Sequence, residues 1–183
     1  MVHHPTIAGS GDPGRSSALY RDLLKLDFPG SKPVRPEDLV ASKTQEAYAY
    51  WLSKNGASAL PLASALDPID IARLLTDCAL FEVVDGDDFK ERIVGEGLKA
   101  NVFPPGVGKH VSEWAKGEEK FWSGLLMALR VVRDHKVPLG LVGDQKGNHR
   151  PTVVTESILL PFVSEAGAVS RIISIVAYFE PQK

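Results

Sequence analysis

The amino-acid sequence predicts an α+β fold in which a five-stranded antiparallel sheet is flanked by helices and preceded by a helical extension. Two apolar runs rich in Val, Ile and Phe, residues 79–84 and 89–94, enclose a turn of Asp and Gly at residues 85–88. This arrangement is typical of a β-hairpin. A broad apolar stripe over residues 118–135 predicts the clearest helix of the chain. Three further strand patterns between residues 137 and 179 complete the predicted sheet.

The composition indicates one domain with an extension and argues against two classes of partner. A chain of 183 residues, 44% of them apolar, is long enough to bury a core. Its 21 Lys and Arg are balanced by 23 Asp and Glu, which leaves a formal net charge of −2. Nucleic acids and anionic membranes are bound through clustered basic charge. We therefore expect neither a nucleic acid nor a membrane as a partner.

The use of cysteine and of apolar segments indicates a cellular location. Because Cys78 is the only cysteine, the sequence predicts neither an internal disulfide nor a multi-cysteine zinc site. This usage is typical of a reducing compartment. No run of about 18 apolar residues predicts a transmembrane helix, and the N-terminus lacks the pattern of a signal peptide. The expected location is the cytoplasm.

Residues 1–41 are expected to precede the domain itself, which we place at residues 42–183. Residues 1–16 are rich in Gly, Ser, Pro and His and predict a flexible lead. Residues 16–28 carry leucines among charged residues, which predicts a short amphipathic helix that could dock on the domain or on a partner chain. Prolines within residues 29–41 predict a linker.

Two helix starts are predicted between this linker and the hairpin. Residues 42–45, Ser-Lys-Thr-Gln, fit the spacing of a capping box. The helix that follows presents Tyr50 and Trp51, which could pack in the core or form a dimer interface, since aromatic residues are enriched at interfaces. Asp67 followed by Pro68 is typical of a second helix N-terminus.

The segment after the hairpin is expected to form a loop over the sheet. Residues 106–109, Gly-Val-Gly-Lys, invite comparison with the phosphate-binding loop, whose pattern is Gly-x4-Gly-Lys-Ser/Thr. Phe103 stands where that pattern needs its first glycine, and His110 stands where it needs the hydroxyl. Nucleotide binding through this loop is therefore not expected.

A series of short motifs carries a family resemblance. These motifs are Tyr50-Trp51, Leu60-Pro61, Asp67-Pro68-Ile69, Leu80-Phe81-Glu82-Val83, Arg92-Ile93-Val94-Gly95, Gly108-Lys109, Pro138 and Leu159-Leu160-Pro161. In this order they resemble the PAS-like family common in alphaproteobacteria, a branch of the PAS superfamily, over residues 45–180. Leu75-Thr76 and Val94 depart from the family pattern, which usually has Leu-Pro and a small residue there.

The resemblance implies a PAS-like sheet that curls around a pocket covered by short helices. In other branches such pockets hold haem, flavin or small metabolites, and the sheet often mediates dimers. It thus implies a cytoplasmic sensory or regulatory module, a homodimer, that binds a small molecule or a partner protein. Because no kinase, cyclase or DNA-binding motif accompanies the domain, its output is expected to pass through a signalling partner protein.

The sequence indicates no particular cofactor. The light-sensing flavin branch uses an Asn-Cys-Arg-Phe-Leu-Gln-like segment, which is absent here, and Cys78 precedes the first strand. Haem would need an axial histidine on the helix or loop that faces the pocket, and in that region the candidates are the loop residue His110 and the helix-end residue His135. We therefore do not expect flavin photochemistry or haem. No set of His, Cys, Asp and Glu has metal-ligand spacing, so no metal site is expected either.

The candidate pocket is mainly apolar. Its candidate residues are Phe103, Trp114, Phe121, Trp122 and Leu125 from the helical segments, Ile93, Ile158 and Ile175 from the strands, and the polar residues His110, Arg92 and Glu156. The same aromatic stripe could instead be closed core with no cavity. Arg92 could bind an anionic ligand, or it could form a structural ion pair with Glu156 or another acid.

No catalytic residue is assigned, because no Ser, His and acid occur in a hydrolase pattern and the paired carboxylates have structural explanations. Two alternatives to the sensory module stay open. One is a small enzyme or carrier that uses the pocket, and the other is a ligand-free interaction module. Strand alternation would place Arg92 and Ile93 on opposite faces of the sheet, so the direction of Arg92 decides its role.

Overall fold

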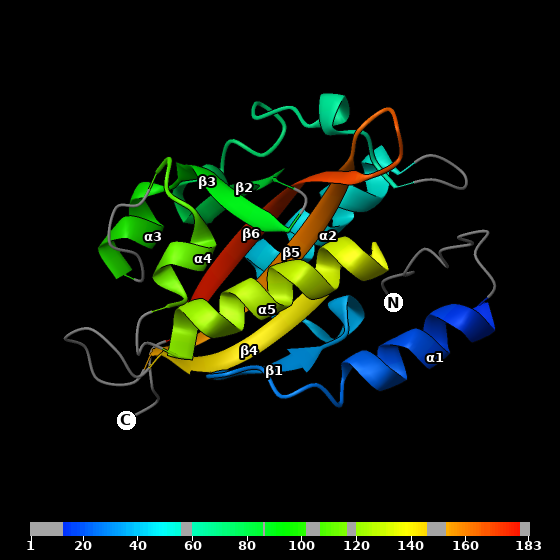
Figure 1. The fold of residues 1–183 in the computed structure, drawn as a ribbon, viewed down its shortest axis with the longest axis horizontal. Coiled ribbons are helices and arrows are strands. Elements are labelled where there is room, and N and C mark those ends of the chain that lie inside the picture. Colours follow the sequence, from blue (N-terminus) through cyan, green and yellow to red (C-terminus); the bar gives the residue numbers. More distant parts are fainter. Residues whose placement is uncertain are drawn as a thin grey trace.

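One six-stranded antiparallel sheet with helices on both faces forms the centre of the computed structural model (Figure 1). The structure describes residues 13–55, 60–85, 87–101, 107–116, 120–145 and 153–179. The strands run in the spatial order β1-β4-β5-β6-β2-β3. Their bounds are β1 (Ser31–Val34), β2 (Cys78–Val84), β3 (Asp88–Val94), β4 (Leu139–Gln145), β5 (Val153–Val163) and β6 (Val169–Phe179). The α+β class is confirmed.

Helices cover the sheet unequally on its two faces. Their bounds are α1 (Pro13–Leu23), α2 (Ser42–Lys54), α3 (Glu96–Asn101), α4 (Val111–Trp114) and α5 (Lys120–His135). In Figure 1 α5 crosses the front of the sheet and α2 lies behind it. We call the face under α5 the inner face and the face under α2 the outer face. No helix among the described residues is long and apolar enough to cross a bilayer.

The five predicted strands are present, and β1 is a sixth strand that the sequence did not predict. It lies in the expected linker and pairs with β4 from Ser31 opposite Gly143 to Val34 opposite Gly140. Proline is tolerated in an edge strand, where one lost N–H donor costs little, so Pro33 does not exclude a strand here. A Cβ atom on Gly143 would lie 2.4 Å from the carbonyl oxygen of Gly30, so this close pairing requires glycine.

The short helix before β1 is anchored on its own chain. The hydroxyl of Tyr20 donates to the carbonyl oxygen of Pro138 at 2.7 Å, and Leu23 is buried. Of the two docking modes left open for this helix, the structure has the one on the same chain. The expected second helix start at Asp67 is wrong: Asp67 accepts a hydrogen bond from the backbone of Ile69, and turns follow instead of an α-helix.

Two apolar clusters, one on each face, stabilise the sheet. The inner cluster includes the fully buried side chains Phe81, Phe89, Leu98, Leu129 and Leu139. The outer cluster joins α2 to β5 and β6 and includes Trp51, Leu74, Leu160, Phe162 and Ile173. Burying a large apolar side chain contributes about 2 kcal/mol, so both clusters are major sources of stability.

Trp51 belongs to the outer cluster and is only 4% exposed. Its Nε1 donates to the carbonyl oxygen of Pro161 at 2.8 Å, which fixes α2 on β5. We predict that Trp51→Phe lowers the free energy of unfolding by about 2 kcal/mol, because a buried carbonyl loses its donor and a cavity forms. Urea denaturation measures this change, with Tyr50→Phe as the milder control. A variant that loses self-association but no stability would favour the interface interpretation of Trp51 instead.

Candidate functional site

The strand residues expected to line the pocket lie apart from the aromatic residues of the helices. Ile158 and Ile175 are direct partners in the β5–β6 pairing, so their side chains share a face of the sheet. That face is the outer one, where both are buried in the cluster under α2. Phe121, Trp122 and Leu125 pack on the inner face. The two groups therefore do not line a common pocket, because successive residues of a strand point to opposite faces.

A β-bulge decides the direction of Arg92. Leu80 pairs with Ile93 but Phe81 pairs with Glu91, so Arg92 is an extra residue in β3. The expected alternation fails at this point, since a bulge breaks the period of two. Both Arg92 and Ile93 are exposed, Ile93 to 45%. Neither residue faces the inner cluster.

Arg92 forms an exposed ion pair with Glu82 of the neighbouring strand. Of the two roles left open for Arg92, the structure has the structural pair, and the partner is Glu82 and not Glu156. Exposed ion pairs contribute little to stability. We predict that Arg92→Ala changes the free energy of unfolding by less than about 1 kcal/mol. Thermal denaturation at low and high salt measures this, and a loss several times larger would contradict a surface role.

Glu156 is a helix cap in this structure. It is 2% exposed and lies on β5, where its two carboxylate oxygens accept the backbone N–H groups of Val40 and Ala41, each at 2.9 Å. The hydroxyl of Thr44 also donates to it. Ala41 is the N-cap residue of α2, and the N–H group at this position has no partner within the helix, so Glu156 supplies its acceptor and places a negative charge at the start of α2. The predicted capping box is wrong, because Gln45 donates to the carbonyl oxygen of Leu39 instead.

Three of the predicted pocket residues meet where α4 packs on α5. The ring centroids of Trp114 and Trp122 are 4.6 Å apart, and those of Phe121 and Trp122 are 5.1 Å apart. The ammonium group of Lys109 lies 5.2 Å from the centroid of Trp114, within the range of a cation–π contact. Leu125 belongs to the inner cluster beside them. Phe103, the remaining helical candidate, lies outside the described residues.

His110 fastens a loop to the edge strand β3. Its Nδ1 lies 3.0 Å from Oδ2 of Asp88, and Ser112 donates to the same carboxylate from its N–H at 3.2 Å and its hydroxyl at 2.5 Å. Although burial raises the pKa of Asp88, hydrogen bonds from Ser112, Phe89 and His110 outweigh it, and the pKa falls below its usual value. His110 is therefore an anchor of the loop in this structure. The described residues contain no group of three or more His, Cys, Asp or Glu that could hold a metal ion.

We call residues 107–110 the strap. Gly108 donates its N–H to the carbonyl oxygen of Glu91 at 2.7 Å, and Glu91 donates its N–H to the carbonyl oxygen of Lys109 at 3.2 Å. Gly108 has a φ of +89°, a conformation that favours glycine. The strap thus pairs with β3 through an isolated antiparallel bridge at the edge of the sheet.

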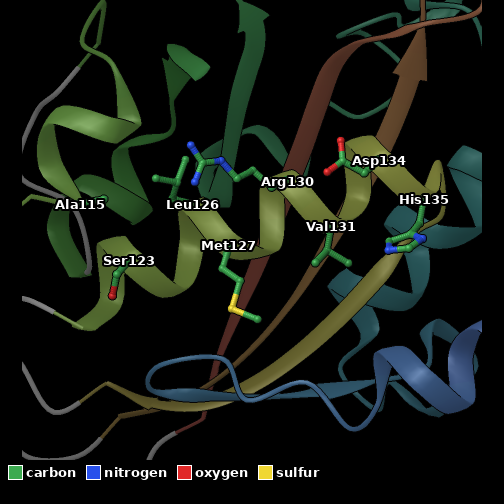
Figure 2. A pocket seen from close by; sticks show the side chains of 8 residues that line it. All are labelled: Ala115, Ser123, Leu126, Met127, Arg130, Val131, Asp134 and His135. Atoms are coloured by element: carbon green, nitrogen blue, oxygen red, sulfur yellow. The ribbon is translucent and has the colours of Figure 1, made fainter. Parts of the chain in front are cut away.

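A groove of about 380 Å³ runs along the side of α5 that faces away from the sheet (Figure 2). Its apolar lining consists of Ala115, Leu126, Met127 and Val131, and its polar lining of Ser123, Arg130, Asp134 and His135. Figure 2 shows Leu126, Arg130 and Asp134 along one side of α5 and Met127, Val131 and His135 along the other. The Nε of Arg130 is buried and has no hydrogen-bond partner among the described residues.

Apart from His135, which was weighed as a haem ligand, the groove residues were not predicted as site residues, because the predicted apolar stripe of this helix faces the sheet. A signal was nevertheless present in the width of that stripe. Met127 and Val131 widen the apolar side of α5, because they pack only partly against the inner cluster and stay partly exposed. A helix that covers one face of a sheet needs only one apolar side.

Comparison with known families identifies the class to which this protein belongs. The model of the PAS domain family matches residues 40–177. The chain therefore belongs to the PAS domain family, and at this level it is a sensory or regulatory module. No match was found among curated proteins.

A solved structure titled "Structure of an RNA-binding Light-Oxygen-Voltage Receptor" is also similar. It is 16% identical, the match covers 90% of this chain and 43% of the receptor chain, and the TM-score is 0.44. The chain thus spans less than half of that receptor. We draw no functional conclusion from a likeness at this level.

Proposed function

We propose that this PAS domain binds a small amphipathic molecule in the groove along α5 and passes the signal to a partner protein. The observation that carries the proposal is the groove itself, which is lined by four apolar residues and four polar ones. Its volume of about 380 Å³ falls within the range of small-molecule pockets. Of the pocket candidates predicted from the sequence, Trp114 does not line the groove itself but directly precedes the lining residue Ala115 in the chain.

The contacts of Arg130 favour a ligand that carries a hydrogen-bond acceptor. One of its terminal nitrogens, Nη2, lies 3.1 Å from Asp87, while its Nε has no partner among the described residues. An unmatched buried donor costs about 1–3 kcal/mol. A carboxylate or carbonyl oxygen in the groove would relieve this cost once the half-exposed guanidinium group turns toward it. The apolar part of the ligand would lie on Met127 and Val131.

Helix α5 is also placed to transmit a signal. Its opposite side carries Ala128, Leu129 and Val132, which are fully buried against the sheet. A ligand can shift the domain between two states only by binding them with different affinity. Because Leu126 lines the groove and also belongs to the inner cluster, occupancy of the groove would bias how α5 packs.

Binding is tested with decanoate and decanol, two probes that share an apolar chain and differ in the acceptor group. Calorimetry below the micellar concentration should show saturable binding of both, with decanoate the tighter. Val131→Arg should abolish binding of both probes by filling the groove, and Arg130→Met should remove only the advantage of decanoate. The matched control is Ile69→Arg, at a residue that is 81% exposed and is not among the residues that line the groove. No saturable binding, or binding that survives Val131→Arg, would refute the proposal.

A second candidate is a ligand-free interaction module, in which a helix of a partner protein occupies the groove. The lining residues recur at intervals of three or four, from Ser123 to His135, along three turns of α5. This spacing suits an amphipathic partner helix. The probe experiment separates the two candidates, because a partner helix needs no affinity for either probe.

We further propose that the domain acts as a homodimer in the cytoplasm. Trp51 is buried within its own chain, so of the two interface candidates on α2 the available one is the partly exposed Tyr50. Light scattering coupled to size exclusion measures the mass directly. A monomer at tens of micromolar would contradict the dimer without affecting the groove.

A further inference from the structure

The inner face contains one carboxylate that none of the contacts above explains. Glu91 is 4% exposed, and its Oε1 is buried with no hydrogen-bond partner among the described residues. It lies opposite Phe81 in the sheet and two residues after Phe89, both fully buried. A buried carboxylate without partners is costly when ionised, so such a group usually holds a proton or gains water.

Glu91 is also the residue to which the strap is fastened. Both of its backbone groups pair with the strap, through Gly108 and Lys109. One residue away along the strap, His110 is held by Asp88 at the start of the same strand. A movement of the β3 backbone at Glu91 would therefore disturb two hydrogen bonds to the strap.

Among the residues that the structure describes, no charged group forms a direct ion pair with the Glu91 carboxylate. On α3, Lys99 lies near enough to attract it, but its ammonium group is 2.7 Å from Glu96. On the strap, Lys109 lies over Trp114. On α5, a terminal nitrogen of Arg130 and one of Arg133 each lie 3.1 Å from a carboxylate oxygen of Asp87. On β2 the residue opposite Glu91 is apolar.

We propose that Glu91 is a proton-binding site that controls the strap, so that the domain responds to pH as a second input. With a proton on Glu91 the strap stays paired with β3. When Glu91 releases this proton to solvent, the charged carboxylate requires hydration, and the strap opens to admit water. The site is separate from the groove of α5, so this input does not depend on the proposed ligand.

The direction of the pKa supports a response near neutral pH. Burial raises the pKa of Glu91 from its ordinary value of 4.5 to about 7, although the attraction of Lys99 opposes this rise. A group with this pKa changes its charge within the range of pH that cells experience. The strap would then be closed on the acid side and open on the alkaline side.

Hydrogen exchange at two backbone amides tests the proposal in the intact chain. Protection of the Glu91 and Gly108 amides, corrected for the intrinsic pH dependence of exchange, should fall at least about tenfold between about pH 6 and pH 8. In Glu91→Gln the protection should stay constant. The amide of Gly95, which donates to the carbonyl oxygen of Cys78 at 2.8 Å, is the internal control and should not change.

A direct titration of the Glu91 carboxyl group tests the proposal without any substitution. The side-chain carboxyl carbon of Glu91, followed by NMR in the wild-type chain, should titrate near neutral pH and together with the loss of protection. Titration near 4.5 would overturn the proposal, as would amides that stay protected across the range. His110 lies on the same strap, so Asp88→Asn is the second control. If the pH dependence survives Glu91→Gln but disappears in Asp88→Asn, the switch belongs to His110 and the proposal is wrong.

Discussion

Replacement of Glu156 by alanine is expected to lower the free energy of unfolding by about 3 kcal/mol, a large effect for one substitution. The carboxylate is buried and accepts hydrogen bonds from Val40, Ala41 and Thr44. Without it the buried N–H group of Ala41 and the partly buried one of Val40 lose their acceptors, and the positive end of the α2 dipole loses its counter-charge. Chemical denaturation at neutral pH measures this loss.

Two controls separate the cap from a general effect of removing charge. Glu82→Ala removes a carboxylate from a partly exposed ion pair and should cost less than about 1 kcal/mol. Glu156→Gln keeps one acceptor oxygen and should fall between the two. Equal losses for Glu156→Ala and Glu82→Ala would show that the cap does not stabilise α2.

The second large effect is a dependence of stability on pH that Glu91 imposes. The pKa of Glu91 in the folded chain is raised from 4.5 to about 7, so between these values the folded state binds more protons than the unfolded state. Stability must therefore fall as pH rises through this window and level off above it. The difference between the two pKa values corresponds to about 3 kcal/mol. The contribution is fully present below about pH 4.5 and fully lost above about pH 7.

Glu91→Gln is expected to remove this component from the stability profile. Denaturant midpoints recorded from about pH 5 to pH 8 should decline for the wild-type chain and decline much less for the variant. The two proteins should differ most on the alkaline side, where the variant is the more stable one. A wild-type profile that rises with pH over this window would contradict the raised pKa of Glu91.

The parts of the fold that local patterns encode could be predicted from the sequence. The turn of Asp and Gly between two apolar runs predicted the β2–β3 hairpin, and the apolar stripe predicted α5. The last three strands were predicted for the same reason, since each is a run of branched and aromatic residues between turn residues. These signals are local because the hydrophobic period is written within a single element.

The features that were missed depend on residues far apart in the chain. Strand β1 is short and contains Pro33, and only its pairing with β4 makes it a strand. The acceptor for the start of α2 comes from Glu156, more than a hundred residues away, so no motif near Ser42 could reveal it. The bulge at Arg92 depends on how β2 pairs with β3.

Prediction of the candidate site was limited by the direction of side chains. Trp114 of α4 contacts Trp122 of α5, and Phe121 contacts Trp122, while the pocket that they were expected to line stays a prediction. Ile158 and Ile175 were assigned to the wrong face, since a strand buried on both sides carries no alternation that distinguishes them. Glu91 gave no signal at all, because a glutamate among strand residues is usually exposed.

The two edges of the sheet affect the tendency of this protein to aggregate in concentrated solution. At one end β1 is only four residues long, includes an imino acid and presents the exposed Lys32, which makes it a poor template for a foreign strand. At the other end the strap occupies part of the backbone of β3. Open-ended growth by strand addition is thus hindered on both sides, and aggregation should be slowest under the conditions that keep the strap in place.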